Sequence, residues 1–380
     1  MEELGIYVHI PFCKRKCSYC DFKSFSNIDE INQKKYVDAL IKEIQNSQNT
    51  NKYIVTTIYI GGGTPSFINE TYIKDILQAI YKKWEIKNDV EITIEVNPGT
   101  ITKEKLEAYK NMGINRLSIG LQSTNNYLLN KIGRIHSYEE FIENYILARK
   151  IGFENINIDL MLALPEQNME DLMQSVKKVI NLNPEHISIY SLILEENTEL
   201  WKKVKNKEEN LVEDDLEREM YWKSKKAFED AGYIHYEISN YAKPGFESKH
   251  NKNCWSQKQY LGFGIAAHSY LNGKRFYNVE DLNKYITNIE KNEFKNNIII
   301  EEENRTKEDV AKEYMMLGLR KIEGVSISEF QRRFELNPLF YFRFEISKLQ
   351  EMDLIEVDLD NIRLTKKGLD LANIVFEEFI

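Results

Sequence analysis

Six short runs of apolar and β-branched residues recur through the first 200 residues, and longer segments with apolar residues at helical spacing separate them. The runs cover residues 5–10, 56–60, 91–96, 116–121, 156–162 and 186–193. Helical periodicity is clear over 31–47, 72–84 and 138–152. Short strands that alternate with helices form parallel sheets with crossover helices. The pattern therefore predicts an α/β protein built from six β/α units.

Six units in this length are too few for a complete eight-unit barrel, which needs roughly 250 residues. We therefore expect a partial (β/α)6 barrel, with an open sheet as the alternative. In both folds ligands bind beyond the carboxyl ends of the parallel strands. The most unusual residues follow those predicted ends: a cysteine cluster, the segment GGGTP at 61–65, Glu95, Gln122 and Asp159.

The pattern changes after about residue 200, which divides the chain into ranges 1–200, 201–300 and 301–380. Residues 212–233 predict a long charged helix. Residues 236–255 and 260–278 are rich in aromatic residues and predict a strand-and-loop extension. In the last range, several helical segments and a hairpin-like segment at 354–368 predict a small winged-helix-like domain.

Composition and charge narrow the classes of function. The chain has 380 residues, of which 42% are hydrophobic, enough for a substantial core. Its formal net charge of -9 argues against general attraction to nucleic acid or anionic lipid. Residues 301–380 carry 18 acidic and 12 basic side chains, whereas a DNA-binding wing should be basic. We expect a structural role for the winged module and no nucleic-acid partner.

No signal peptide and no apolar run of roughly 18 residues is seen, so a cytoplasmic location is expected. Peripheral membrane association would then need a partner.

Three of the four cysteines stand together as Cys13-x3-Cys17-x2-Cys20. Thiolates at this spacing suit an iron–sulfur cluster or zinc. Zinc would need a fourth ligand, for which His9 is an awkward candidate, whereas a [4Fe-4S] cluster with three cysteines leaves one iron open to a chelating ligand.

The cysteine motif, with Tyr19 before its last cysteine and the GGGTP segment after the second predicted strand, resembles the radical S-adenosylmethionine (SAM) superfamily. The strings YVHIPFCKRKCSYCDF, YIGGGTPS, IEVNP, GLQS, NIDLMLALP and YLGFGIAAHS are similar to one branch of it. That branch contains the oxygen-independent coproporphyrinogen III dehydrogenase HemN and the heme chaperone HemW, and the similarity extends over nearly the whole chain.

The resemblance implies that Cys13, Cys17 and Cys20 hold a [4Fe-4S] cluster whose open iron binds the amino and carboxylate groups of SAM. Carboxylate and amide side chains can hydrogen-bond the ribose hydroxyls and the methionyl amine, and a guanidinium can form a bidentate hydrogen bond with a carboxylate. Reductive cleavage of SAM, with flavodoxin or ferredoxin as the reductant, is open to such a scaffold. The implied SAM contacts are Tyr7, Gly62, Gly63, Thr64, Glu95, Gln122, Arg134 and Asp159.

Three features favour the chaperone type over the dehydrogenase. The dehydrogenase has a further cysteine where this chain has Phe22, and an extension of about fifty residues before its first strand. The chaperone type has an H-N-x-x-Y-W motif linked to heme, which residues 250–255 match except that cysteine replaces tyrosine. Imidazole is a common axial ligand of heme, and an indole can cover a porphyrin face. The heme candidates are, in order, His250 and His268, followed by Cys254 and Trp255.

We therefore expect a HemW-type heme chaperone that binds heme and a SAM-coordinated cluster and delivers heme to a respiratory protein at the membrane. Coproporphyrinogen III oxidation in porphyrin synthesis is the alternative, and homodimer formation is left open. Each candidate also has a structural interpretation. A lone histidine is more often hydrogen-bonded within the core than a ligand, and a lone cysteine is more often a small buried apolar residue.

Overall fold

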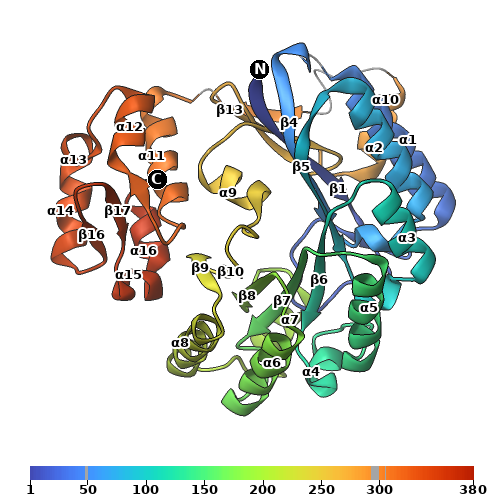
Figure 1. The fold of residues 1–380 in the computed structure, drawn as a ribbon, viewed down its shortest axis with the longest axis horizontal. Coiled ribbons are helices and arrows are strands. Elements are labelled where there is room, and N and C mark those ends of the chain that lie inside the picture. Colours follow the sequence, from blue (N-terminus) through green and yellow to red (C-terminus); the bar gives the residue numbers. More distant parts are fainter. Residues whose placement is uncertain (48–49, 292–298, 304) are drawn as a thin grey trace.

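The computed structural model describes residues 1–47, 50–291, 299–303 and 305–380. Its main feature is one twelve-stranded sheet with the order β14-β13-β12-β11-β1-β4-β5-β6-β7-β8-β10-β9. Figure 1 shows this sheet curving around a central space, with helices on its outer side and a separate helical domain at the carboxyl end. The predicted fold class, a partial (β/α)6 barrel with a small second domain, is confirmed.

Six consecutive parallel strands form the barrel, and helices on its outer surface connect them. The strands are β1 (Glu2–Ile10), β4 (Tyr53–Gly62), β5 (Glu85–Val96), β6 (Arg116–Gln122), β7 (Ile156–Leu162) and β8 (His186–Ser191). The helices are α1 (Glu30–Asn46), α2 (Glu70–Lys83), α3 (Lys103–Asn111), α4 (Asn126–Lys131), α5 (Tyr138–Ile151) and α6 (Met169–Leu182).

Local sequence signals fix where these helices begin. Asp29 and Asn69 cap α1 and α2 by accepting a backbone N–H at the first turn, and Ser137 and Glu140 form a capping box at the start of α5. Apolar side chains from the outer faces of the strands pack against the helices in one continuous core. The inner faces of the strands also carry polar side chains, among them Ser118, Asn157 and Asp159, which line the space inside the barrel.

Additional strands extend the barrel sheet at both ends. At the β8 side lie β10 (Asn240–Ala242) and β9 (Ile234–Glu237), and at the β1 side β11 (Tyr260–Phe263), β12 (His268–Leu271), β13 (Lys274–Asn278) and β14 (Ile299–Glu303). The helices of this part are α7 (Glu199–Lys205), α8 (Asp214–Asp230), α9 (Lys249–Trp255) and α10 (Leu282–Glu290). The predicted charged helix at 212–233 corresponds to α8.

The prediction of strand and loop over residues 236–255 was wrong for residues 249–255, which form helix α9. Ser248 caps this helix by accepting the N–H of Asn251. The buried carboxylate of Glu91 on β5 accepts the backbone N–H groups of Lys249 and His250, each at 3.0 Å. Two backbone N–H groups in the first turn of α9, which have no partner within the helix, are thus bonded by a strand about 160 residues away in the sequence. No local sequence pattern reveals this contact.

The carboxyl-terminal domain has its own core. Its strands β15 (Val325–Ser326), β17 (Asn361–Leu364) and β16 (Ile355–Val357) form an antiparallel sheet in that order. Its helices are α11 (Lys307–Gly318), α12 (Ile327–Phe334), α13 (Pro338–Tyr341), α14 (Arg343–Glu351), α15 (Lys366–Asp370) and α16 (Ala372–Glu377). The three predicted domain ranges stay predictions, and they include residues 48–49, 292–298 and 304, which lie outside the described residues.

A buried carboxylate joins this domain to the extended sheet. Glu313 on α11 accepts hydrogen bonds from Arg275 Nε on β13 and Gln257 Nε2 after α9, both at 2.5 Å, and from Arg305 Nη1 at 2.7 Å. Arg333 on α12 also donates to Gln257 Oε1 at 2.8 Å. The arrangement ties α9, β13 and the carboxyl-terminal domain together.

We expect Glu313→Gln to lower the free energy of unfolding by about 3 kcal/mol, because it removes the buried carboxylate that the partly buried guanidinium groups of Arg275 and Arg305 share. Urea denaturation followed by circular dichroism would measure the loss. Glu308→Gln is the matched control, since Glu308 lies on the same helix but is exposed and pairs only with Lys312. Equal stabilities of the two variants would contradict a role for Glu313 in joining the domains.

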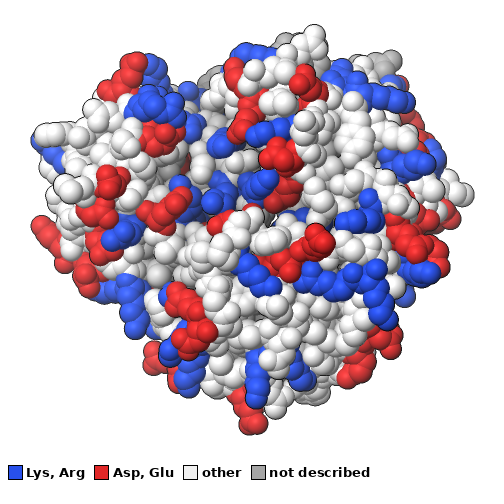
Figure 2. All heavy atoms as spheres, in the orientation of Figure 1, with Lys and Arg blue, Asp and Glu red and all other residues white. Residues whose placement is uncertain are grey.

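Within the described residues, no helix combines the length and apolar character needed to cross a membrane. Figure 2 shows acidic and basic side chains interspersed over the visible face, without a continuous basic stripe.

Candidate functional site

The carboxyl ends of the barrel strands surround a cavity of about 370 Å³, and the cysteine loop closes one side of it. Cys13 lies in the short strand β2 (Phe12–Cys13), which pairs with β3 (Phe25–Ser26). Further along the loop, Ser18 donates its N–H to Ile132 O after α4 and accepts the N–H of Leu200 on α7. The loop is thus anchored from both sides.

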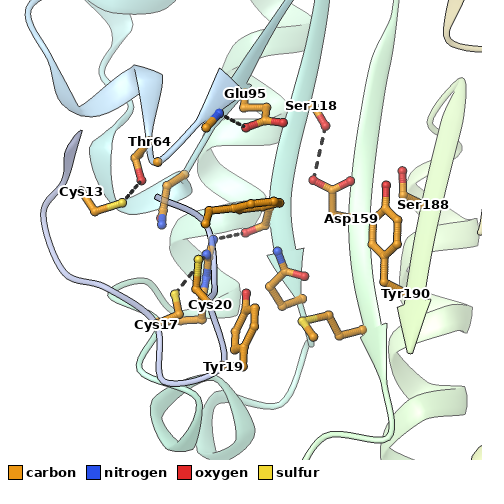
Figure 3. Close-up of a pocket in the computed structure, with 18 of the residues that line it drawn as sticks. Cys13, Cys17, Tyr19, Cys20, Thr64, Glu95, Ser118, Asp159, Ser188 and Tyr190 are labelled. Carbon is orange, nitrogen blue, oxygen red and sulfur yellow. Dashed lines mark hydrogen bonds between the residues drawn. The ribbon is translucent and has the colours of Figure 1, made fainter. Parts of the chain in front are cut away.

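All three cysteines of the motif are free thiols that line this cavity. Figure 3 shows them at one end of it, with Asp159, Ser188 and Tyr190 toward the other. Thr64 Oγ1 donates to Cys13 Sγ at 3.4 Å, and Arg134 Nη1 donates to Cys17 Sγ at 3.6 Å. Donors aimed at sulfur favour the thiolate form.

Burial nevertheless raises the pKa of Cys20 to about 11, and it raises that of Cys13 as well. Cys13 and Cys20 are therefore protonated at neutral pH until a cation binds them. Among the described residues, no three His, Cys, Asp or Glu side chains already stand at the spacing of metal ligands. Three thiols on one anchored loop, with two hydrogen-bond donors at their sulfurs, form a donor set that suits an iron–sulfur cluster, and binding would release their protons.

The glycine segment lies directly against the cysteine loop. Gly63 donates its N–H to Ile10 O at 2.8 Å, and Thr64 donates to Phe12 O at 2.9 Å. A Cβ atom on Gly63 would lie 3.0 Å from three backbone atoms of the β1–β2 connection. Gly62 has φ +111°, and a Cβ there would lie 2.6 Å from the ring of His9. Side chains are excluded here because two backbones approach closely.

Glu95, at the end of β5, holds the glycine segment from the barrel side. Its carboxylate accepts the O–H of Tyr59 at 2.8 Å and the N–H of Gly62 at 3.1 Å. Burial raises the pKa of Glu95 to about 7, against the effect of these donors. The group therefore titrates near neutral pH, where small changes in its surroundings alter its charge.

Arg134 and Gln122 lie on the wall between the cysteines and β6. Arg134 Nη2 donates to Gly120 O at 2.5 Å, while its buried Nε has no partner among the described residues. Gln122 ends β6 with a left-handed backbone, φ +72°. Both side chains line the cavity, which leaves Arg134 with an N–H free for a ligand carboxylate.

Asp159, in the middle of β7, lies deeper in the barrel. It accepts from Asn157 Nδ2 at 2.7 Å and from Ser118 Oγ at 3.3 Å, and burial raises its pKa. Asn157 in turn accepts from Ser188 Oγ at 3.1 Å and bonds His186 Nδ1 at 2.6 Å. A connected set of polar side chains from β6, β7 and β8 thus forms the inner wall.

Of the eight residues predicted to contact SAM, seven line this one cavity, and Tyr7 does not. The Tyr7 ring instead stacks on Tyr59 with a centroid distance of 6.3 Å, and its hydroxyl bonds His9 Nδ1 at 3.0 Å. The cavity is also lined by residues that the sequence argument did not select: Tyr59, Arg116, Ser118, Asn157, Ser188, Tyr190 and Asn251. Most occupy alternate positions of predicted strands, so the period of two could have indicated them.

The four heme candidates occupy different surroundings. His250 is buried, bonds Thr57 Oγ1 through Nδ1 at 2.9 Å and stacks on Tyr59 with a centroid distance of 5.2 Å. Burial lowers its pKa to about 4. Trp255 carries the guanidinium of Arg320 at 4.5 Å from its ring centroid, and burial raises the pKa of Cys254 to about 12. His250 and Trp255 of α9 are thus both in contact with residues outside that helix.

His268 is exposed at the start of β12, with its ring stacked on Tyr277 at 5.0 Å. Tyr260 of β11 pairs with Tyr270, which places Gly262 beside His268 in the antiparallel pair. Gly262 in turn pairs with Tyr7. Because alternate residues share a face of a sheet, His268 lies on the same face as Tyr7 and the cavity-lining Tyr59.

Comparison with known proteins agrees with the predicted fold and superfamily. Residues 7–179 match the model of the Radical SAM superfamily, and residues 306–371 match that of the HemN C-terminal domain. A solved structure of coproporphyrinogen III oxidase (HemN) from Escherichia coli superposes with a TM-score of 0.86. It covers 100% of this chain and 90% of that one at 24% identity, which shows a shared fold. Fold and motif together define a radical SAM protein, a class in which SAM and a [4Fe-4S] cluster are typical cofactors.

More similar relatives are proteins named heme chaperone HemW. The protein from Bacillus subtilis is 38% identical over 377 residues, which cover 98% of each chain. The one from Lactococcus lactis is 37% identical over 377 residues, covering 98% of this chain and 96% of the relative. The Escherichia coli protein is 37% identical over 269 residues, or 70% of each chain. The chain therefore belongs to the HemW family.

Proposed function

We propose that this protein is a heme chaperone that binds heme together with a SAM-coordinated [4Fe-4S] cluster and passes heme to a respiratory protein at the membrane. The similarity to named heme chaperones over nearly the full length is the observation that carries this proposal. A cytoplasmic location, with attachment to the membrane through the acceptor protein, follows from this role.

The cysteine end of the cavity supplies the cofactor chemistry in this proposal. Cys13, Cys17 and Cys20 would hold the cluster, which supplies an open iron for SAM and, with an electron from flavodoxin or ferredoxin, the means to cleave it. The backbone of the glycine segment and the Thr64 hydroxyl would bind the methionyl end, and Arg134 its carboxylate. Glu95, Gln122 and Asp159 would accept from the ribose hydroxyls, while Tyr7 would support Tyr59 from behind.

Phe22 favours the chaperone over a coproporphyrinogen dehydrogenase. It stands where the dehydrogenase has a substrate-handling cysteine, and it lines the mouth of the cavity with 61% of its surface exposed. Ile193, 66% exposed, lines the same mouth. An exposed apolar rim suits the face of a porphyrin better than it suits thiol chemistry.

We propose His268 as the heme ligand. It is exposed and lies on the sheet face that carries the cavity, whereas His250 would have to leave a buried stack and a hydrogen bond with Thr57. We expect hemin titration of the wild type to give a Soret band that His268→Ala shifts or abolishes. His250→Ala serves as the comparison and should keep the spectrum. The reverse result would assign the iron to the α9 motif.

An anaerobic turnover assay separates the proposal from the alternative enzyme. The reconstituted protein would be supplied with coproporphyrinogen III, SAM and reductant, and protoporphyrinogen would be measured over many turnovers. We expect none above background, together with saturable hemin binding and transfer of heme to respiratory membranes. Sustained turnover would replace the chaperone by an oxygen-independent coproporphyrinogen III oxidase. Analytical ultracentrifugation with and without heme would test the homodimer.

A further inference from the structure

A buried arginine at the inner end of the cavity lacks a partner. Arg116 begins β6, is only 2% exposed and lines the cavity that holds the cysteines. Its Nε is fully buried without a hydrogen bond, and no hydrogen bond or ion pair joins its guanidinium to any side chain in the described ranges. A guanidinium has five N–H donors, and burying them unsatisfied is costly.

The residue opposite Arg116 is unsatisfied as well. Thr93 of β5 pairs with Arg116 in the parallel register and is fully buried, and its hydroxyl has no partner among the described residues. The two residues are direct neighbours on adjacent strands: the Arg116 guanidinium lines the cavity, and the Thr93 hydroxyl lies beside it within the buried wall. Both are groups that bind a carboxylate.

The acidic groups nearby do not supply that carboxylate. Glu95 is engaged by Tyr59 and Gly62, Asp159 is engaged by Asn157 and Ser118, and Glu91 caps α9. The charge of Arg116 acts on Glu95 and Asp159 through space, yet burial still raises the pKa of both carboxyls. Neither carboxyl forms an ion pair with Arg116, so within the described part of the chain the Arg116 charge has no direct partner.

The neighbouring neutral groups form fixed walls. His186 bonds Asn157 at 2.6 Å and the Tyr236 hydroxyl at 2.7 Å, and burial holds its pKa well below the usual range. Ser188 donates to Asn240 Oδ1 at 2.6 Å. With their own bonds made, these side chains leave Arg116 and Thr93 as the open donors of this end. In Figure 3, Ser188 and Asp159 lie across the cavity from the cysteines, so this end is separate from the cluster position.

We propose that Arg116, with the unpartnered Thr93 hydroxyl beside it, binds the carboxylate of a ligand that shares the barrel with SAM. Apolar side chains between this end and the mouth, among them Met161, Leu192 and Ile193, suit a ligand with an apolar body. Two sources have this chemistry: a propionate of a tetrapyrrole and a free organic acid. The carboxylate site stands independently of the proposed function, and only its assignment to heme rests on that function.

The test uses the reconstituted protein saturated with SAM, in the wild type and in Arg116→Gln. Hemin, hemin dimethyl ester and sodium propionate are the three ligands, with sodium chloride at equal ionic strength as the blank. If a heme propionate occupies the site, hemin binds the wild type at least about tenfold more tightly than the variant, since a charge-assisted fork is lost. The ester, whose propionates are capped, then binds both proteins equally.

If a free acid occupies the site, hemin affinity is unchanged by the substitution, and propionate raises the melting temperature of the wild type but not of Arg116→Gln. The exposed Arg332→Gln is the control for loss of an arginine. Thr93→Val removes the hydroxyl at nearly constant volume and should weaken binding of the same ligand. It replaces Arg116→Gln in the test if that variant does not fold. The inference is overturned if neither ligand distinguishes these variants from the control. If hemin binds neither the wild type nor any variant, only the proposed heme function is contradicted. The titration with propionate would still test whether Arg116 binds a carboxylate.

Discussion

Cys17→Ser is expected to abolish assembly of the iron–sulfur cluster and with it the binding of SAM. Only three cysteines line the cavity, so a cluster that already has an open iron would lose one of its three protein ligands. Serine can still accept the hydrogen bond from Arg134 that Cys17 accepts at 3.6 Å, so the loop itself should remain in place. Iron per chain after anaerobic reconstitution should fall from about four to near zero, with loss of the charge-transfer absorbance.

The fourth cysteine provides the matched control. Cys254 lies on α9, is also a free thiol and is not among the residues that line the cavity. Cys254→Ser should keep the full iron content. Wild-type iron content in Cys17→Ser, or equal loss in both variants, would contradict the assignment of the cluster to the loop.

Glu95→Gln is expected to weaken SAM binding by about tenfold or more while it flattens the pH dependence of stability. The amide can accept only through one atom, so one of the donors that now bond the carboxylate, Tyr59 O–H or Gly62 N–H, would face an NH2 group. The glycine segment would shift as a result. Isothermal titration of the reconstituted protein measures the affinity, and Glu85→Gln at the exposed start of the same strand is the control.

The expected effect on the pH dependence of stability follows from the raised pKa of Glu95, which is about 7 compared with an ordinary value of 4.5. Between those values the unfolded chain has lost the proton while the folded protein keeps it, so the wild type loses stability as pH rises from 5 to 8. The loss is on the order of 2 kcal/mol from this group. Glutamine cannot titrate and lacks this contribution.

Urea denaturation of the apoprotein at pH 5 and pH 8 would measure the difference. Glu43, which bonds Tyr285 and Gly264, also has a pKa raised by burial to about 7, but it contributes equally to both proteins and cancels in the comparison. The same change in stability with pH for wild type and Glu95→Gln would show that Glu95 does not titrate in this range.

Much of the barrel could be predicted from local pattern because strand and helix periodicity are properties of neighbouring residues. The runs at 116–121 and 156–162 coincide with β6 and β7 within one residue. The run at 91–96 covers only the second half of β5, since the first half is interrupted by the polar residues Lys87, Asn88 and Asp89. Helix α9 was missed because seven polar and aromatic residues have no apolar stripe, and a distant glutamate caps them.

Within the candidate site, too, local motifs could be predicted from the sequence and contacts between distant residues could not. The cysteine and glycine motifs could be found directly, since both lie on contiguous loops whose backbone conformation depends on residue type. The proposed ligand-binding role of Arg116 and Thr93 could not be predicted in this way, because it depends on the absence of hydrogen-bond partners for both side chains among the described residues. The difference between His250 and His268 likewise rests on burial, which neither the motif around residue 250 nor the aromatic composition reveals.

The sequence by itself determined the α/β class, the six-unit repeat and the three-thiol donor set, because these depend on residues that are close together in the chain. Only the tertiary structure decided which polar groups are satisfied. Seven of the predicted SAM contacts come from β4, β5, β6 and β7 and their loops, and they reach one cavity because the parallel strands end at one edge. Burial then raises the pKa values of Glu95 and Asp159, and the packing of distant strands leaves Arg116 without a partner among the residues that the structure describes.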